Sequence, residues 1–150
     1  MPCPYFEPRQ VVARPTLANA RLPLIDEYDG VCRAHTDSIP VEAATRMRLC
    51  NHGNARGGCE HFPAEEQRSA FRFEVLRRSA AHLDVLFIEE VFYAPLSWRR
   101  HEFRMEGEQL EPDMDDCCQR AQMIAFCRSY LRQYPMETQI ILNHVKSANK

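Results

Sequence analysis

Lysine is scarce in this chain of 150 residues. Lys146 and Lys150 are the only lysines among 19 basic residues, so arginine carries almost all of the positive charge. Acidic residues number 21, which leaves a formal net charge of -2. A protein that binds nucleic acid or an anionic membrane through a basic surface normally carries an excess of positive charge. The composition therefore argues against both of these partner classes and leaves a protein partner open.

A secretory leader and a long hydrophobic run are also missing. The first residues lack the basic stretch and the apolar stretch that together make a signal peptide. The most apolar segment, 83–93, is interrupted by Asp84, Glu89 and Glu90, and it is much shorter than the roughly 20 residues that span a bilayer. We therefore expect a cytoplasmic protein that does not cross a membrane.

Seven cysteines are present in this otherwise ordinary composition. Hydrophobic residues make up 45% of the chain and charged residues 27%, as in one soluble globular domain covering 1–150. In a reducing compartment, thiols serve as metal ligands, nucleophiles or core residues, and an odd number of them fits a closed disulfide framework poorly. The cysteines are therefore the first candidates for chemistry.

Three zones along the chain predict an α+β fold. Residues 1–65 are rich in proline and cysteine, which favours an irregular segment apart from a short helix between Pro40 and about Asn51. Residues 69–106 are predicted to form a three-stranded antiparallel meander: apolar and polar side chains alternate in the first strand, and 83–93 is a nearly continuous apolar run that suggests a central strand covered on both faces. We expect Pro95 to separate the second strand from the third.

The last zone, 113–150, is predicted to be helical. Acidic residues after Pro112 favour a helix N-terminus, and we expect one long helix from about Asp115 to Tyr134. Residues with the spacing of a buried helical stripe are Cys117, Ala121, Ile124, Cys127 and Leu131. The apolar segment 138–145 is compatible with either a strand or a helix.

The strongest chemical pattern lies in the first zone, where four cysteines occur within 59 residues. The loop from Cys50 to Cys59 reads Cys-Asn-His-Gly-Asn-Ala-Arg-Gly-Gly-Cys, and four of the five glycines in the chain lie close to these cysteines. Glycine allows tight turns and lets backbone N–H groups approach a bound sulfur or anion. The pattern therefore predicts a metal site built from Cys3, Cys32, Cys50 and Cys59.

Two metals are compatible with this site. Four thiolates would hold a [4Fe–4S] cluster, and Cys3 precedes a proline, as the last ligand of many cluster motifs does. Three cysteines with His35 in place of Cys3 would instead hold a structural zinc (Zn). Neither a Cys-x2-Cys zinc knuckle nor a standard ferredoxin spacing is present. A cluster would use Cys3 as a ligand, whereas the zinc site leaves Cys3 without a role. We therefore favour an iron–sulfur cluster, and zinc remains the alternative.

These metal sites predict different functions. An iron–sulfur cluster would serve a redox, sensing or structural role, whereas a zinc site would suit an adaptor that binds a protein partner. A weaker hypothesis is a small enzyme, in which carboxylates and a base come from Glu89, Glu90, His101 and Glu102. Such residues more often form the solvent face or the end of a strand. Enzymatic activity therefore stays open.

Two fragments of the first zone resemble those of small uncharacterised bacterial proteins. They are Cys3-Pro4-Tyr5-Phe6-Glu7-Pro8 and Cys50-Asn51-x-Gly53-x-Ala55-Arg56-Gly57-x-Cys59. The resemblance implies that the four cysteines belong to one motif, and it brings no activity to transfer. His52 and His61 flank the last two cysteines, and we expect them at the surface or beside a ligating sulfur.

Overall fold

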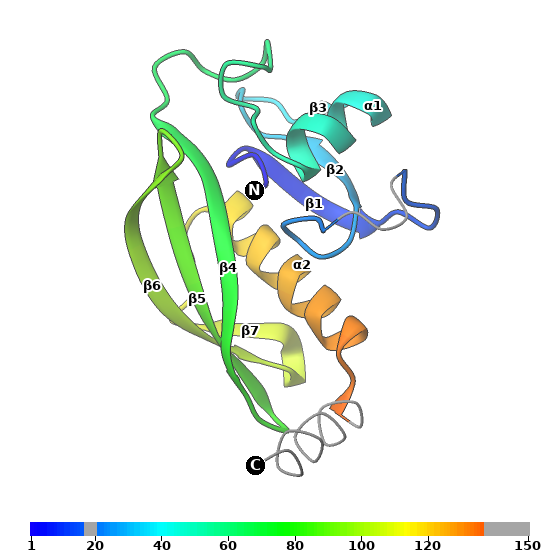
Figure 1. Cartoon of the computed structure of the whole chain (residues 1–150), viewed down its shortest axis with the longest axis vertical. Coiled ribbons are helices and arrows are strands. Elements are labelled where there is room, and N and C mark those ends of the chain that lie inside the picture. The colour runs from blue at the N-terminus through cyan, green and yellow to red at the C-terminus, as the bar shows by residue number, and fades with distance from the viewer. Residues whose placement is uncertain (17–20, 137–150) are drawn as a thin grey trace, which may run out of the picture.

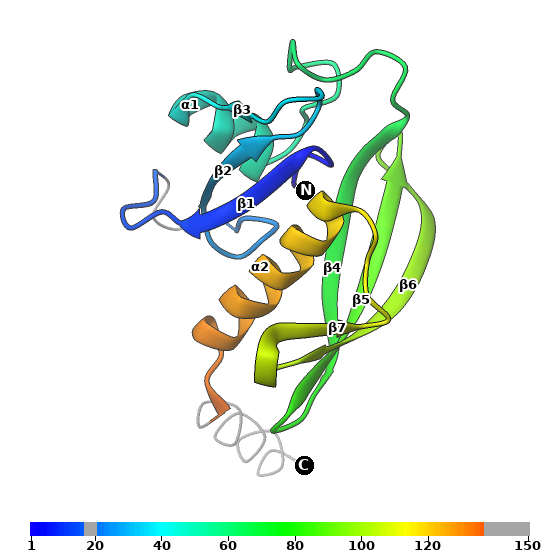
Figure 2. The ribbon, with the colours of Figure 1, turned by 180° about the vertical axis from the view of Figure 1, so that it is seen from behind.

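The computed structural model describes residues 1–16 and 21–136. It contains two antiparallel sheets and one long helix, α2 Cys117–Gln133, which lies between the two sheets (Figure 1). Figure 2 shows the same arrangement from behind. The predicted combination of helix and antiparallel sheet is therefore confirmed. Within the described ranges, no helix has the length and apolar character needed to cross a membrane.

The N-terminal zone is more regular than its proline content predicts. It forms a three-stranded sheet in the order β1 Phe6–Val11, β2 Tyr28–Cys32 and β3 Ile39–Pro40. β1 is an edge strand, and its register shifts between Pro8 and Gln10. A proline is tolerated at a sheet edge or a bulge because it need not donate a hydrogen bond to a neighbouring strand there. The prediction of an irregular segment is therefore wrong for these residues.

A short helical segment lies where the sequence predicts one. It consists of α1 Ala43–Thr45 and the π-helical turn η1 Arg46–Asn51. The buried side chain of Asn51 accepts a hydrogen bond from the Tyr28 N–H at 2.8 Å and donates one to the Tyr28 carbonyl at 2.9 Å. Asn51 thus pairs with β2 as a neighbouring strand would, and it fixes η1 against the sheet.

The second sheet contains four strands, one more than predicted. The predicted meander is formed by β4 Arg68–Arg78, β5 His82–Val91 and β6 Ala94–Arg104. After the short 3-10 turn η2 Glu106–Glu108, a further strand, β7 Gln109–Glu111, pairs with the end of β6. The added strand is only three residues long, which is too short to leave a clear pattern of alternating side chains.

Pro95 does not separate two strands as predicted. The β5–β6 hairpin turns at Phe92 and Tyr93, which have positive φ angles of 49° and 62°. Pro95 lies inside β6 and is paired with Glu90 of β5. Among the residues that the structure describes, no strand flanks this part of β6 on its other side, and the register with β5 shifts here, so a proline without an N–H is tolerated.

One face of the second sheet packs on α2. In β4, Phe73 is buried and its ring stacks on that of Phe126 in α2, with centroids 5.5 Å apart, whereas Arg72 is exposed. Buried residues of β5 alternate with partly exposed ones, of which Leu86 and Ile88 are apolar. β5 is therefore covered mainly on one face, whereas its sequence predicts a strand covered on both.

α2 spans the predicted range, but its buried surface differs from the predicted stripe. Asp116 caps the helix, since one carboxylate oxygen accepts from the N–H groups of Cys118 and Gln119, both at 2.9 Å. Cys117, assigned to the apolar stripe, is exposed, and the buried residues include Gln122 and Ser129. The buried arc is wide because α2 touches both sheets. The apolar segment 138–145 lies outside the described residues.

Phe87 should be a major contributor to stability. Its side chain is fully buried, and its ring centroid lies 5.3 Å from that of Phe71 and 5.8 Å from that of Phe73. Because Phe87→Ala leaves a cavity, we expect it to lower the free energy of unfolding by about 3–5 kcal/mol in urea denaturation. Leu76→Ala, at an exposed position of β4, should change it by less than about 0.5 kcal/mol. Equal effects of the two substitutions would contradict this packing.

Candidate metal centre

The four N-terminal cysteines come from four different segments and meet at one place. Cys3 precedes β1, Cys32 ends β2, Cys50 belongs to η1, and Cys59 lies in the loop between η1 and β4. All four line a single cavity. The other residues that line it are Tyr5, Phe6, Ala34, Val41, His61 and Phe62.

Three of the four thiols are almost completely removed from solvent. Cys3, Cys32 and Cys50 retain 6, 7 and 5% of their exposure, whereas Cys59 is half-buried. Burial, reinforced by the neighbouring Cys32 and Cys59, raises the pKa of Cys50 to about 12. Burial is also the main cause that raises the pKa of Cys3, and the three other cysteines add to it. Because these thiols raise one another's pKa, a cation is needed before all of them can ionise.

Two backbone N–H groups act in the opposite direction. A hydrogen bond from the Tyr5 N–H lowers the pKa of Cys3, and one from the Ala34 N–H lowers the pKa of Cys32, although burial keeps both values raised. In each case the donor lies two residues after the cysteine. Such bonds favour the thiolate form, and hydrogen bonds to sulfur also tune the reduction potential of iron–sulfur clusters.

The thiols are not arranged around a preformed metal position. Four thiolates bound to zinc at about 2.3 Å lie about 3.8 Å from one another, whereas no three of the four cysteine sulfurs in this cavity lie within 4.8 Å of one another. The cavity itself has a volume of about 10 Å³, roughly the space of one water molecule. The cysteine side chains would therefore have to move to hold either a single ion or a cluster.

A histidine borders the cavity, but it is not the predicted one. His35 is exposed and is not among the residues that line the cavity. His61 does line the cavity, and its ring meets that of His35 edge-on, with centroids 5.9 Å apart. The short spacing between Cys59 and His61 is the sequence signal that could have identified this residue.

Hydrogen bonds from two sides hold the segment that carries Cys3. The Cys3 N–H donates to the Cys50 carbonyl at 3.0 Å, which joins two of the cysteine segments directly. From α2, the buried Gln122 amide donates to the carbonyl of Cys3 at 2.8 Å and to that of Phe6 at 2.7 Å. These bonds set the position of the Cys3 backbone. Sequence reasoning missed Gln122, because its role depends on how α2 packs.

Close backbone approach explains two of the glycines beside the cysteines. A Cβ atom on Gly30 would lie 2.2 Å from the carbonyl oxygen of Glu7, so β1 and β2 can pair this closely only with glycine there. Gly53 has a φ of +111°, and a Cβ atom would lie 2.1 Å from the carbonyl oxygen of Met1. A side chain at either position would displace a segment next to a cysteine.

The Cys59 loop is braced against the β5–β6 hairpin. The guanidinium carbon of Arg56 lies 4.2 Å from the centroid of the Phe92 ring, and the Tyr93 hydroxyl donates to the Arg56 carbonyl at 3.3 Å. Arg56 also donates through Nε to the carbonyl of Glu66 at 3.2 Å. Arg56 therefore links the loop to the second sheet.

The residues of the enzymatic hypothesis do not gather in one place. The cross-strand partner of His101 is Val85, five residues before Glu90 on β5, which corresponds to about 17 Å of strand. Glu90 is buried and ion-paired with Arg72 at 2.7 Å. The Nδ1 atom of His101 lies 2.7 Å from the carbonyl oxygen of Pro112. Each of the two residues thus has a partner of its own.

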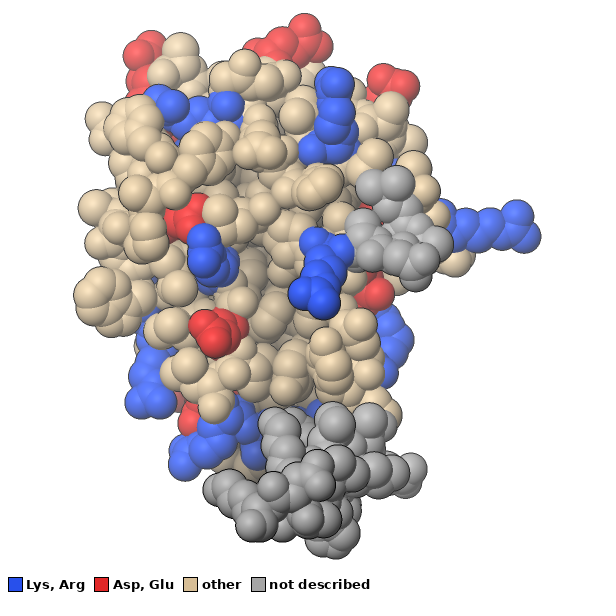
Figure 3. All heavy atoms as spheres, in the orientation of Figure 1, with Lys and Arg blue, Asp and Glu red and all other residues tan. Residues whose placement is uncertain are grey.

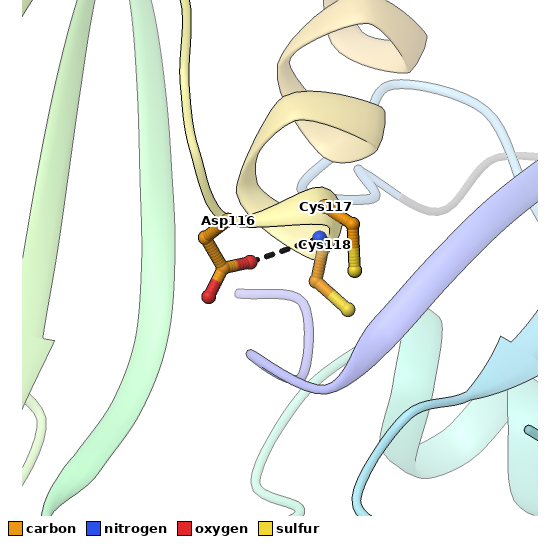
Figure 4. A group of neighbouring side chains, drawn as sticks. All are labelled: Asp116, Cys117 and Cys118. Atoms are coloured by element: carbon orange, nitrogen blue, oxygen red, sulfur yellow. Dashed lines mark hydrogen bonds between the residues drawn. The ribbon is translucent and has the colours of Figure 1, made fainter. Parts of the chain in front are cut away.

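A compact group of potential ligands lies at the start of α2. The carboxylate of Asp116 and the thiols of Cys117 and Cys118 lie within 4.8 Å of one another (Figure 4). One carboxylate oxygen caps the helix, and the other lies 3.4 Å from the guanidinium of Arg68. The carboxylate is therefore already occupied by contacts within the protein.

A second compact group lies on the surface of the second sheet. It consists of His82, Asp84 and Glu102, whose ligand atoms also lie within 4.8 Å of one another. Asp84 is ion-paired with Arg77 at 2.9 Å, and Glu102 with Arg104 at 3.0 Å. Because both carboxylates already have cationic partners, this group is best described as a surface ion-pair network.

Comparison with known proteins does not assign the site. The chain matches no family model, no curated protein and no solved structure. The case for a metal centre therefore depends on the chain's own residues, above all on the four thiols that share one cavity.

Glu66 anchors the N-terminal segment close to the cavity. Its carboxylate accepts from the Tyr5 hydroxyl at 2.6 Å, and from the Arg68 side chain and backbone N–H at 2.8 and 2.9 Å. Partial burial acts to raise the pKa of Glu66, but the hydrogen bonds from Arg68 and Tyr5 outweigh it and lower the pKa to about 2. Ionised Glu66 therefore stabilises the folded state.

This contribution should depend on pH. It is present above the unfolded-state pKa of about 4.3 and is lost as the pH falls toward 2. We expect Glu66→Gln to lower the free energy of unfolding by about 1–2 kcal/mol at neutral pH, allowing for solvent screening, and to have little effect at pH 2. Urea denaturation across this range measures the difference, with Glu65→Gln at an exposed position as control. A difference that does not vary with pH would contradict the anchor.

Proposed function

We propose that this protein binds a [4Fe–4S] cluster through Cys3, Cys32, Cys50 and Cys59. The observation that carries the proposal is the convergence of these four thiols on one cavity from four separate segments. Clusters of this type take four cysteine thiolates.

The surrounding residues suit such a cofactor. Tyr5, Phe6 and Phe62 contribute apolar walls to the cavity. The N–H groups of Tyr5 and Ala34 donate to sulfur and favour the thiolate form of Cys3 and Cys32. A bound cluster would supply one-electron chemistry, at a potential that depends on these hydrogen bonds and on exposure to solvent.

The half-buried Cys59 supports a redox or sensing role. Two surface hollows adjoin this residue, and both are also lined by Gly58 and Glu60. The other three cysteines are buried, so Cys59 marks the corner of the site that an electron-transfer partner or an oxidant reaches first.

A structural zinc is the second candidate, and the position of His61 favours it. Three of the cysteines with His61 give the ligand types of a closed tetrahedral zinc site. The metal would then stabilise the N-terminal zone of an adaptor that binds a protein partner.

Anaerobic purification followed by metal and sulfide analysis distinguishes the two candidates. We expect the wild-type protein to be brown and to contain about four iron and four sulfide ions per chain. Cys3→Ser should lower the iron content severalfold, because one ligand is lost. His61→Ala should keep the cluster. Cys127→Ser is the matched control, since Cys127 is a fully buried thiol of the core that does not line the cavity.

Other outcomes have equally clear meanings. Stoichiometric zinc that is lost in His61→Ala but kept in Cys3→Ser would replace the cluster by the zinc candidate. A wild-type protein without any bound metal would contradict both candidates. A cluster that neither reduces reversibly nor degrades with hydrogen peroxide would remove the redox and sensing roles and leave a structural one.

A further inference from the structure

Two further thiols stand next to each other at the start of α2. Cys117 and Cys118 are free cysteines, and their sulfur atoms lie within 4.8 Å of each other. Figure 4 shows both sulfur atoms turned to the same side of the first helical turn. Cys117 is exposed, whereas Cys118 retains only 3% of its exposure. The pair therefore forms a two-sulfur group that solvent reaches through Cys117.

The two cysteines are poorly placed to form a disulfide with each other. Cα atoms of consecutive residues are about 3.8 Å apart across a trans peptide bond, whereas bridged cysteines usually have Cα atoms about 4.4–6.8 Å apart. Closing the bond would also disturb the first turn of α2, where the Cys118 N–H donates to Asp116 at 2.9 Å. The pair therefore stays a dithiol, which suits the binding of a thiophilic ion.

Other potential ligands around the pair are already engaged. Burial is the main cause that raises the pKa of Cys118, and nearby acidic groups, among them Asp116 and Glu7, add to it. Asp116 is occupied by the helix cap and by an arginine, and Glu7 is ion-paired with Arg33. Among the described residues, no histidine belongs to this group. Only the two sulfur atoms are therefore free to bind an ion.

A site with two sulfur ligands selects an ion that needs few ligands. Thiolates favour soft ions, of which Cu(I) and zinc are the common ones in proteins. Zinc sites take three or four protein ligands, which the pair does not offer, whereas Cu(I) is stable between two thiolates. On the face seen in Figure 1, Figure 3 shows Lys and Arg interspersed with Asp and Glu, without a large acidic patch among the described residues that would attract hard cations. Ligand type and number therefore decide the choice of ion.

We propose that Cys117 and Cys118 bind one Cu(I) ion. Each thiol releases its proton to solvent and two copper–sulfur bonds form, so the complex carries one negative charge. The N-terminus of a helix carries a partial positive charge, which favours an anion there, and α2 is 17 residues long. Copper enters and leaves through the exposed Cys117. The proposal does not depend on the metal centre of the N-terminal cysteines.

Anaerobic titration with Cu(I), in competition with the chelator bathocuproine disulfonate, tests the proposal on the full chain with whatever metal it carries after purification. We expect the wild-type protein to take up one Cu(I) ion more per chain than Cys117→Ser, because serine offers no soft ligand. Cys118→Ser should lose the same ion. Asp116→Asn, which keeps the helix cap, should retain it. Cys127→Ser is the control, since this buried thiol lies in the core.

X-ray absorption at the copper edge identifies the ligands, and we expect two sulfur neighbours. Equal copper uptake by wild type and Cys117→Ser, or copper with three or four sulfur ligands, would place the ion at the N-terminal cysteines and overturn the proposal. Loss of the ion in Asp116→Asn would overturn the two-sulfur site, and uptake of zinc that Cys117→Ser abolishes would overturn the choice of ion. Cys117 is exposed, so its variant should fold and keep the iron content of the wild type.

Discussion

Four thiols in one buried cavity cannot all ionise unless a cation compensates their charge. This constraint bears on the whole N-terminal zone, because its cysteines come from four segments that meet at this cavity. Hydrogen bonds from Gln122 and between Cys3 and Cys50 hold two of these segments in place. The sheets and α2 thus supply the positions of the sulfurs, and a metal would supply the charge that lets them act together.

Strand and helix periodicity made most of the second half of the fold predictable. The alternation around Phe73 and the length of α2 follow directly from side-chain spacing. The proline content of the N-terminal zone predicts an irregular segment rather than a sheet. Proline is compatible with a sheet here because Pro8 lies in an edge strand beside a bulge. Hydrophobic spacing predicts the wrong buried face for α2, because two buried residues of this helix are polar. Gln122 donates to the Cys3 carbonyl, and Ser129 shares a hydrogen bond with the Tyr28 hydroxyl.

The cysteine set of the candidate site was predictable, and its companions were not. Clustering of thiols and glycines identified the four residues that share the cavity. The Cys-x2-His spacing of Cys32 and His35 is typical of a ligand pair, but the chain turns so that His61 borders the cavity instead. The role of Asn51 could not be predicted from the sequence either, because its hydrogen bonds to Tyr28 depend on how η1 packs against β2.

X-ray absorption spectroscopy at the iron and zinc edges, on protein purified without oxygen, tests the central claim most directly. The account predicts iron with a shell of sulfur ligands and a second shell of iron neighbours, as in a cluster bound by Cys3, Cys32, Cys50 and Cys59. A zinc edge with sulfur at about 2.3 Å and a nitrogen ligand, and no iron, would contradict the cluster. The absence of both metals would contradict the metal centre itself.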